Sequence, residues 1–296
     1  MELNLSDRFK HLKLFEKSLF VFWAILTVLM SIFYSNIGNA SLYIILHLLL
    51  IALLLTLVPW LDKKKGKYWI FLRYWYFILI LPLFYLDVGN FLHLVTPLEY
   101  DSFILAFEEH LFGVIPNIWI LDYVNPYLTE VMQISYSIYW ITIPLGAAIF
   151  YSEKRLDLFE YLLYYVSITF FISYLIFIFM PVAGPRFFIV EQITVKYEGF
   201  LLTDILRGFM KQAGYRGGAF PSSHVGVAVT ILVILWHFKT RTAKKVFLPL
   251  VIALSMATVY GQYHYVTDVV AGLILGLCVG MWGSGQIRKK LTRASG

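Results

Sequence analysis

Long apolar runs separated by short polar stretches set the hydropathy pattern of this chain. Eight runs approach or exceed about 18 residues, the length that a helix needs to cross a hydrocarbon core of about 30 Å. The runs lie roughly at 18–36, 41–60, 68–86, 129–151, 160–181, 222–237, 246–262 and 265–283. The pattern therefore predicts an all-α integral membrane protein with about eight transmembrane helices.

The connection between the third and fourth runs, residues 87–128, is long and mixed in character. Apolar side chains recur in it at helical spacing, opposite two glutamates: Phe103, Ile104, Phe107 and Leu111 against Glu108 and Glu109. This spacing predicts an amphipathic helix in the outer membrane interface, either as a gate for lipids or as a spacer. We expect one multi-pass domain, with three N-terminal helices in 1–86, this outer interfacial connection, and the remaining helices in 129–296.

The composition agrees with a membrane protein. Of the 296 residues, 60% are hydrophobic and 14% are charged, which is far more apolar than an ordinary soluble domain. The first run follows a charged stretch and lacks a small-residue cleavage site, so we expect it to be retained rather than removed as a signal peptide. The single cysteine, Cys278, excludes a disulfide framework.

Eight spans place both chain ends on one side of the membrane, and basic residues gather there. Nineteen of the 24 lysines and arginines fall on that side, counting Arg73, whose guanidinium we expect to reach back to the interface. The other five lie in one loop: Arg186, Lys196, Arg207, Lys211 and Arg216. Because cytoplasmic loops carry the basic excess, we expect a bacterial cytoplasmic membrane, both termini in the cytoplasm and this loop outside. Nonspecific binding of anionic lipid headgroups is one explanation of the loop.

The sixth run begins with polar residues directly after the basic loop. Its first turn, in the stretch GGAFPSSH, contains Ser222, Ser223 and His224. The first backbone N–H groups of a helix lack internal partners and carry partial positive charge, so this position attracts an anion such as phosphate. The alternative is a purely structural role, in which the serines only cap the helix.

Two further segments on the same predicted side of the membrane carry ionisable side chains. His264 and Asp268 are spaced i, i+4 where the eighth run begins, so the carboxylate could accept the imidazole Nδ1–H and leave Nε2 free to attack. A purely structural aspartate remains the alternative. Arg186, in the stretch MPVAGPRFF after the fifth run, has a planar fork that suits two phosphate oxygens. We expect all three segments to meet at one anion-sized site.

The fourth run combines polar and aromatic side chains. A polar stripe at helical spacing could line a substrate cavity or bond to other helices: Glu130, Gln133 and Ser137. Three aromatic side chains beside it could border a headgroup or belong to an interfacial belt: Tyr136, Tyr139 and Trp140.

These motifs resemble the type 2 phosphatidic acid phosphatase superfamily. The likeness is strongest in PSSH and HYVTD, and it looks most like the branch containing inositol phosphorylceramide synthases, where the middle motif reads Phe-Pro-Ser-x-His. The motif matches cover residues 180–272. The resemblance implies a six-helix catalytic core with extra N-terminal helices before it.

The resemblance also implies a catalytic or binding role for each motif residue. His264 would be the nucleophile that forms a phosphohistidine, Asp268 would hold its tautomer, and His224 would protonate the leaving alkoxide. Three further residues would bind the phosphoryl oxygens: Arg186, Ser222 and Ser223. Because neutral and protonated imidazoles are both needed, we expect a bell-shaped pH profile.

The chain departs from the family pattern at two cationic positions. Phe179 stands where a lysine is expected, and Ala257 and Thr258 replace a serine–arginine pair. Three outer-loop residues could substitute: Arg207, Lys211 and Arg216. Arg216 is the best placed of these because it lies eight residues before His224.

The sequence thus favours an enzyme that acts on a lipid phosphate ester at the extracytoplasmic face. The acceptor could be a lipid hydroxyl or a polyol, giving a phospholipid or sphingolipid transferase, or water, giving a lipid phosphate or polyprenyl diphosphate phosphatase. No cluster has metal-ligand spacing, so we expect neither metal nor cofactor, and no nucleic acid partner. A transporter is less favoured, because charges in the middle of the runs are nearly absent.

Overall fold

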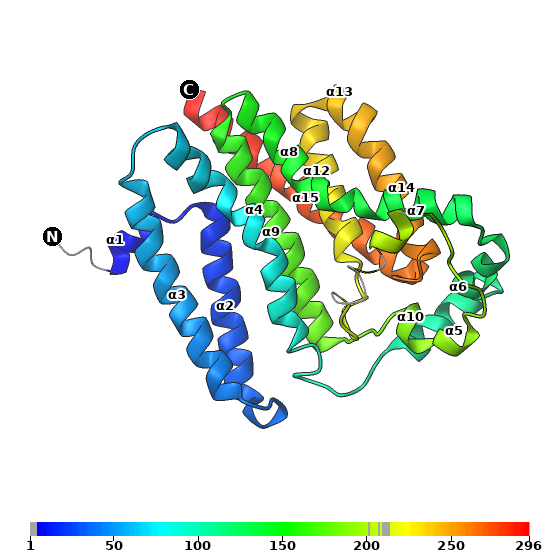
Figure 1. The fold of residues 1–296 in the computed structure, drawn as a ribbon. Helices are drawn as coiled ribbons and strands as arrows, with labels where there is room; N and C mark the ends of the chain where they lie inside the picture. Colours follow the sequence, from blue (N-terminus) through cyan, green and yellow to red (C-terminus); the bar gives the residue numbers. More distant parts are fainter. Residues whose placement is uncertain (1–4, 201, 207, 209–213, 296) are drawn as a thin grey trace.

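The computed structural model describes residues 5–200, 202–206, 208 and 214–295 and is built from helices (Figure 1). Six helices are long and apolar enough to cross a membrane, and up to eight spans result if each of two bent helix pairs counts as one. All eight predicted apolar runs are helical. The sixth run forms a helix of 16 residues, the same length as the predicted run.

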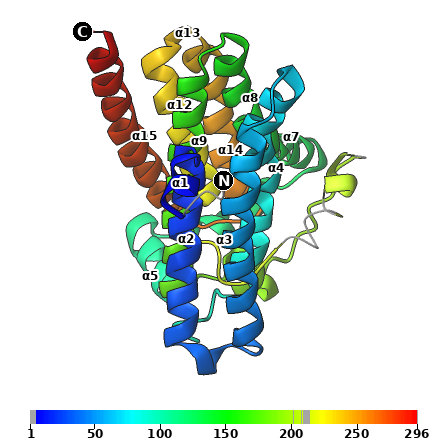
Figure 2. The same ribbon diagram turned by 90° about the vertical axis from the view of Figure 1, so that its left-hand side faces the viewer.

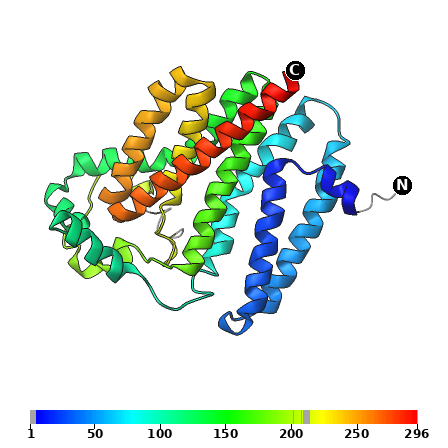
Figure 3. The same cartoon turned by 180° about the vertical axis from the view of Figure 1, so that it is seen from behind.

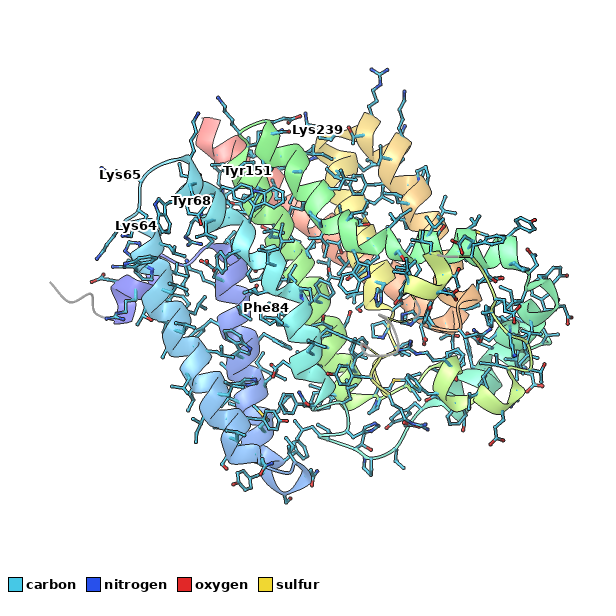
Figure 4. All side chains as sticks on the ribbon, in the orientation of Figure 1. Lys64, Lys65, Tyr68, Phe84, Tyr151 and Lys239 are labelled. Carbon is cyan, nitrogen blue, oxygen red and sulfur yellow. The ribbon has the colours of Figure 1, made fainter. Side chains whose placement is uncertain are left out.

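The N-terminal segment forms a group of three long helices. Helices α2 and α3 lie side by side and are joined by a short turn (Figures 1 and 2). Phe84 on the third helix places its ring 5.8 Å from Trp23 and 6.1 Å from Phe171, measured between centroids, and so links the group to the rest of the protein (Figure 4). The elements are α1 (Leu5–Lys10), α2 (Leu14–Ile32), η1 (Tyr34–Asn36), α3 (Ala40–Asp62) and α4 (Lys67–Gly89).

Arg73, whose guanidinium was expected to reach back to the interface, bonds to the first turn of α2 and to the last residue of α3. Its side chain is buried and donates hydrogen bonds to Glu16 and, at 2.6 Å, to Asp62. A buried charge is tolerated when it is paired and hydrogen-bonded. Acidic partners from α2 and α3 therefore hold this arginine inside the N-terminal group.

The connection after α4 contains the predicted amphipathic helix. It comprises α5 (Asp101–Phe112), α6 (Pro116–Trp119) and η2 (Ile120–Tyr123), with a bend of 74° after α5. Phe103, Phe107 and Leu111 are exposed as expected, whereas Ile104, which was placed on the same face, is buried. Glu108 is fully buried, which corrects the polar face drawn from the sequence, because its Oε1 accepts a 2.6 Å hydrogen bond from the backbone N–H of Thr267.

The remaining helices form the part of the molecule that carries the three motifs. Helix α15 crosses behind α9 and α12, and its C-terminal end lies at the same end of the molecule as α13 (Figures 1 and 3). The elements are α7 (Pro126–Ser137), α8 (Tyr139–Ser152), α9 (Leu156–Phe179), α10 (Pro185–Phe188), η3 (Val190–Gln192), α12 (Ser223–Phe238), α13 (Thr240–Thr242), η4 (Ala243–Phe247), α14 (Leu248–Tyr260) and α15 (Val266–Ser295).

Glycines let α15 pack directly against the backbone of α12. A Cβ atom added at Gly276 would lie 2.4 Å from the carbonyl oxygen of Gly226, and one added at Gly272 would lie 2.5 Å from that of Ser222. A Cβ atom added at Gly280, four residues further on, would lie 2.7 Å from Cβ of Val233. Small residues four apart allow two membrane helices to approach closely. This contact fixes the start of α15 against the start of α12.

The length of α12 also positions the site. At 1.5 Å per residue, its 16 residues make it about 12 Å shorter than the 24-residue α9. Lys64 and Lys65 lie at the same end of the molecule as Lys239, which follows α12 (Figure 4). The N-terminus of α12 is therefore recessed within the helical layer, on the side away from these lysines.

Candidate active site

Backbone hydrogen bonds join the three predicted motif segments. Val182 and residues 217–219 form an isolated β-bridge, in which Ala219 N–H donates to the Val182 carbonyl at 3.0 Å. Arg186 N–H donates to the Gln262 carbonyl at 3.1 Å, and Ser222 N–H donates to the Asp268 carbonyl at 2.9 Å. Each segment is thus tied to the other two, and the structure brings the three motifs together as expected.

His264 lies in the loop between α14 and α15 with its tautomer defined by a carbonyl group. Nδ1 is 2.9 Å from the Ala219 carbonyl oxygen, which can only accept, so Nδ1 must carry the proton. The Asp268 carboxylate lies 3.5 Å from the same nitrogen and accepts a 2.8 Å hydrogen bond from Tyr265 N–H. The predicted Asp268 hydrogen bond is therefore replaced by one to Ala219, and Nε2 is left unprotonated.

Burial shifts the acid–base behaviour of His264. The side chain is almost fully enclosed, and this burial lowers the pKa of the imidazole below its ordinary value. The hydrogen bond to Ala219 raises the pKa, and the positive charge of Arg186 lowers it further. The neutral form, with a free lone pair on Nε2, is thereby favoured.

His224 faces His264 across a short gap. The centroids of the two imidazoles are 5.7 Å apart. His224 packs on the ring of Tyr139, and its Nε2 is 3.2 Å from the Tyr136 hydroxyl. One tetrahedral oxyanion can therefore be within reach of both imidazoles.

Arg186 supplies positive charge to the same place. It stacks on Phe187 and Tyr263, with its guanidinium carbon 4.7 Å and 5.4 Å from the two ring centroids. Among the described residues, no carboxylate forms an ion pair with this guanidinium. Stacking orients the fork without neutralising it.

The two serines of the motif differ in position. Ser223 lines the cavity together with His224. Ser222 is fully buried, and its hydroxyl caps α12 by accepting from Val225 N–H at 3.5 Å. The cap interpretation therefore describes the Ser222 side chain.

These groups line one cavity of about 310 Å³. Arg186, Ser223 and the two histidines lie in its polar part. An apolar wall comes from α4, α8 and α9 and includes Ile78, Leu81, Leu86, Trp140, Ile143 and Phe170. Six tyrosines also line the cavity: Tyr85, Tyr136, Tyr139, Tyr174, Tyr215 and Tyr263. An amphipathic ligand matches this division.

Some predicted residues do not reach the cavity. Arg216 is half exposed and makes a bidentate pair with Glu99, at 2.6 and 2.7 Å, which lowers the pKa of that carboxyl. Arg216 is thus not brought to the site as a replacement for the missing cations. Lys211 and Arg207 lie outside the described residues.

The polar stripe of the fourth run also bonds elsewhere. Glu130 accepts hydrogen bonds from the backbone of Phe200, Leu202 and Thr203, and Gln133 bonds with the Tyr263 hydroxyl. The aromatic residues beside the stripe, rather than the stripe itself, border the cavity.

A family model described as PAP2 superfamily matches residues 102–282. This range is more than half of the chain and contains all three motif segments. The chain belongs to the PAP2 superfamily. No match was found among curated proteins or solved structures. As a PAP2 superfamily membrane protein, the chain is consistent with a lipid phosphatase or phosphotransferase, and helix α4 adds cavity residues from outside the matched range.

Proposed function

We propose that this PAP2 superfamily protein transfers a phosphoryl-containing group from a lipid phosphate ester through a phosphohistidine on His264, without a metal ion. The observation that supports this proposal is the arrangement of one cavity. His264 has a carbonyl-fixed tautomer, His224 lies 5.7 Å away between centroids, and Arg186 lines the same space.

The proposed reaction has two steps. The Nε2 lone pair of His264 attacks phosphorus, the bond from phosphorus to the leaving oxygen breaks, and His224 gives that oxygen its proton. An acceptor hydroxyl then loses its proton to His224 and attacks phosphorus, which breaks the bond to Nε2 and restores His264. Arg186 and Ser223 stabilise the charge that develops on the phosphoryl oxygens.

The cavity favours a phosphodiester donor and a headgroup transfer. Arg186 is the only lysine or arginine among the described residues that line it, and a diester brings one formal negative charge where a monoester brings up to two. The tyrosine hydroxyls can hydrogen-bond to a polyol such as inositol, and the wall from α4, α8 and α9 matches a lipid tail. A lipid hydroxyl, as in ceramide or diacylglycerol, would then accept the group.

Water as the acceptor is the second candidate. It would make the protein a phosphatase for lipid phosphates or polyprenyl diphosphates. The absence of a family lysine at Phe179 weakens this reading, because a diphosphate needs more positive charge than Arg186 alone supplies.

We also propose that the reaction occurs at the extracytoplasmic face, with both termini in the cytoplasm. Support comes from Lys64, Lys65 and Lys239, which lie at one end of the molecule, away from the recessed start of α12 (Figure 4). Basic loops remain on the cytoplasmic side during membrane insertion.

The test uses full-length protein purified in detergent. It is incubated with lipid phosphomonoesters, diphosphates and phosphodiesters labelled at phosphorus, with and without added ceramide, diacylglycerol or inositol. Free phosphate and new lipid products are both measured, and an acid-labile, base-stable label on the protein identifies the phosphohistidine.

His264→Ala and His237→Ala are the paired variants. His237 lies at the other end of α12 and bonds to the Val233 carbonyl, so its loss should leave turnover within about twofold. His264→Ala should lose turnover and label by at least about 10³-fold. Turnover by His264→Ala near that of the wild type would refute the nucleophile. Free phosphate as the sole product would show that water is the acceptor and that the protein is a phosphatase.

A further inference from the structure

A buried carboxylate outside the motifs connects two of them. Asp101, the first residue of α5, is fully buried. Its Oδ2 accepts a hydrogen bond from Ala183 N–H at 2.7 Å, and its Oδ1 accepts from Gly184 N–H at 2.9 Å and from the Tyr265 hydroxyl at 2.9 Å. Three donors from two remote segments thus converge on one side chain.

The partners of Asp101 lie next to the reacting groups. Gly184 precedes Arg186 by two residues, and Tyr265 follows His264 directly. We infer that Asp101 is a positioning residue that fixes the Arg186 guanidinium relative to the His264 imidazole. This inference rests on the proposed function and assigns a role to the connection that the sequence suggested as a gate or a spacer.

Only a carboxylate satisfies all three donors. Its two oxygens offer about four lone-pair positions, whereas asparagine turns one oxygen into a donating NH₂ group. In Asp101→Asn that NH₂ would face a backbone N–H, and at least one donor would be left unpaired in a buried site. The loop that carries Arg186 would then lose part of its attachment to the loop that carries His264.

A second contact from the same connection supports a scaffold role. Asn117 donates through Nδ2 to the His264 carbonyl at 3.2 Å, and the backbone carbonyl of Asn117 accepts from Gln262 Nε2 at 2.8 Å. The connection therefore forms hydrogen bonds to the His264 loop from α6 as well as from α5. Backbone packing is tight here too, because a Cβ at Gly184 would lie 3.2 Å from the Tyr263 carbonyl oxygen.

The experiment compares three variants of the full chain in detergent. Asp101→Asn removes the bridge, and Tyr265→Phe removes one of its three hydrogen bonds without changing the ring. Glu16→Gln is the matched control, because Glu16 is an equally buried carboxylate that bonds to Arg73, in the N-terminal helices away from the cavity. Turnover is measured with the best substrate of the panel, and thermal stability is measured on the same samples.

Binding of orthovanadate supplies a readout that does not require turnover. Vanadate accepts a fifth ligand, so it reports whether His264 Nε2 and the oxyanion donors are aligned on one centre. The shift of the thermal unfolding midpoint with vanadate concentration gives its affinity. Wild-type protein should bind it, and His264→Ala should not.

We expect Asp101→Asn to lower kcat at least about tenfold with KM within about threefold, because small misplacements of reacting groups reduce the rate of the chemical step. Vanadate affinity should fall at least about tenfold. The kcat and the vanadate affinity of Tyr265→Phe should lie between those of Asp101→Asn and those of the wild type. Glu16→Gln should lose thermal stability but keep kcat and vanadate affinity within about twofold.

The outcomes separate this inference from the proposed function. Wild-type kcat and vanadate affinity in Asp101→Asn would overturn the positioning role alone, as would equal losses in Glu16→Gln. If Asp101→Asn does not fold, unchanged vanadate affinity in Tyr265→Phe overturns it. Wild-type protein that neither binds vanadate nor turns over any substrate would overturn the proposed function, and the positioning role with it.

Discussion

The close contact of α15 with α12 allows one prediction to be worked out in detail. The perturbation is Gly276→Ala, a single methyl group on α15. The added Cβ would lie 2.4 Å from the Gly226 carbonyl oxygen and 2.7 Å from Cβ of Val229. Because the first of these atoms is backbone, it cannot rotate away, and the helices must separate.

The size of the effect follows from these distances. Carbon and oxygen atoms approach to about 3.3 Å in close contacts between helices, so the two helices must part by about 1 Å. Overpacking of this kind costs about 1–3 kcal/mol. Ser222 N–H also donates to the Asp268 carbonyl across this contact, so the two histidines would shift relative to each other, and a 1 Å misplacement can reduce turnover about 100-fold.

Gly285→Ala provides the matched control on the same helix. No atom lies within 4 Å of a Cβ added there, and both substitutions gain the same helix propensity of about 0.5–1 kcal/mol. We expect Gly276→Ala to unfold several degrees below Gly285→Ala in detergent, at about 2–4 °C per kcal/mol. Turnover of Gly276→Ala should fall about 10- to 100-fold. Equal midpoints and equal turnover of the two variants would refute the packing argument.

Three further predictions concern the site itself. Arg186→Lys should reduce kcat/KM by about 10- to 100-fold, since ammonium cannot make the paired contact of the guanidinium fork; turnover within twofold of the wild type would contradict this role. Burial lowers the pKa of His264 below its ordinary value of 6.5, so the neutral nucleophile should persist as pH falls and the acidic limb of kcat/KM should lie below pH 6.5; a limb above that value would argue against it. Arg216→Gln should leave kcat/KM within about threefold of the wild-type value, because an exposed ion pair with Glu99 contributes only about 0–1 kcal/mol to stability. A 100-fold loss of kcat/KM would instead indicate that Arg216 binds the phosphate.

The amphipathic connection shows where the sequence pattern fails. Its apolar face was drawn correctly at Phe103, Phe107 and Leu111, which are exposed. The polar face was drawn at Glu108 and Glu109, yet Glu108 is buried against the backbone N–H of Thr267, and the pattern gave Asp101, which is also buried against backbone N–H groups, no role. A periodic pattern records which side chains are polar, but the partner that satisfies a buried carboxylate comes from another part of the chain.

The sequence by itself determined the helices and the three motif segments, because the length of an apolar run and the residues at a helix N-terminus act locally. Only the tertiary structure decided the hydrogen bonds of the site. The i, i+4 spacing of His264 and Asp268 presupposed one helix, but α15 begins at Val266. His264 therefore lies outside the helix, where its Nδ1–H is directed to Ala219, a carbonyl 45 residues earlier in the chain.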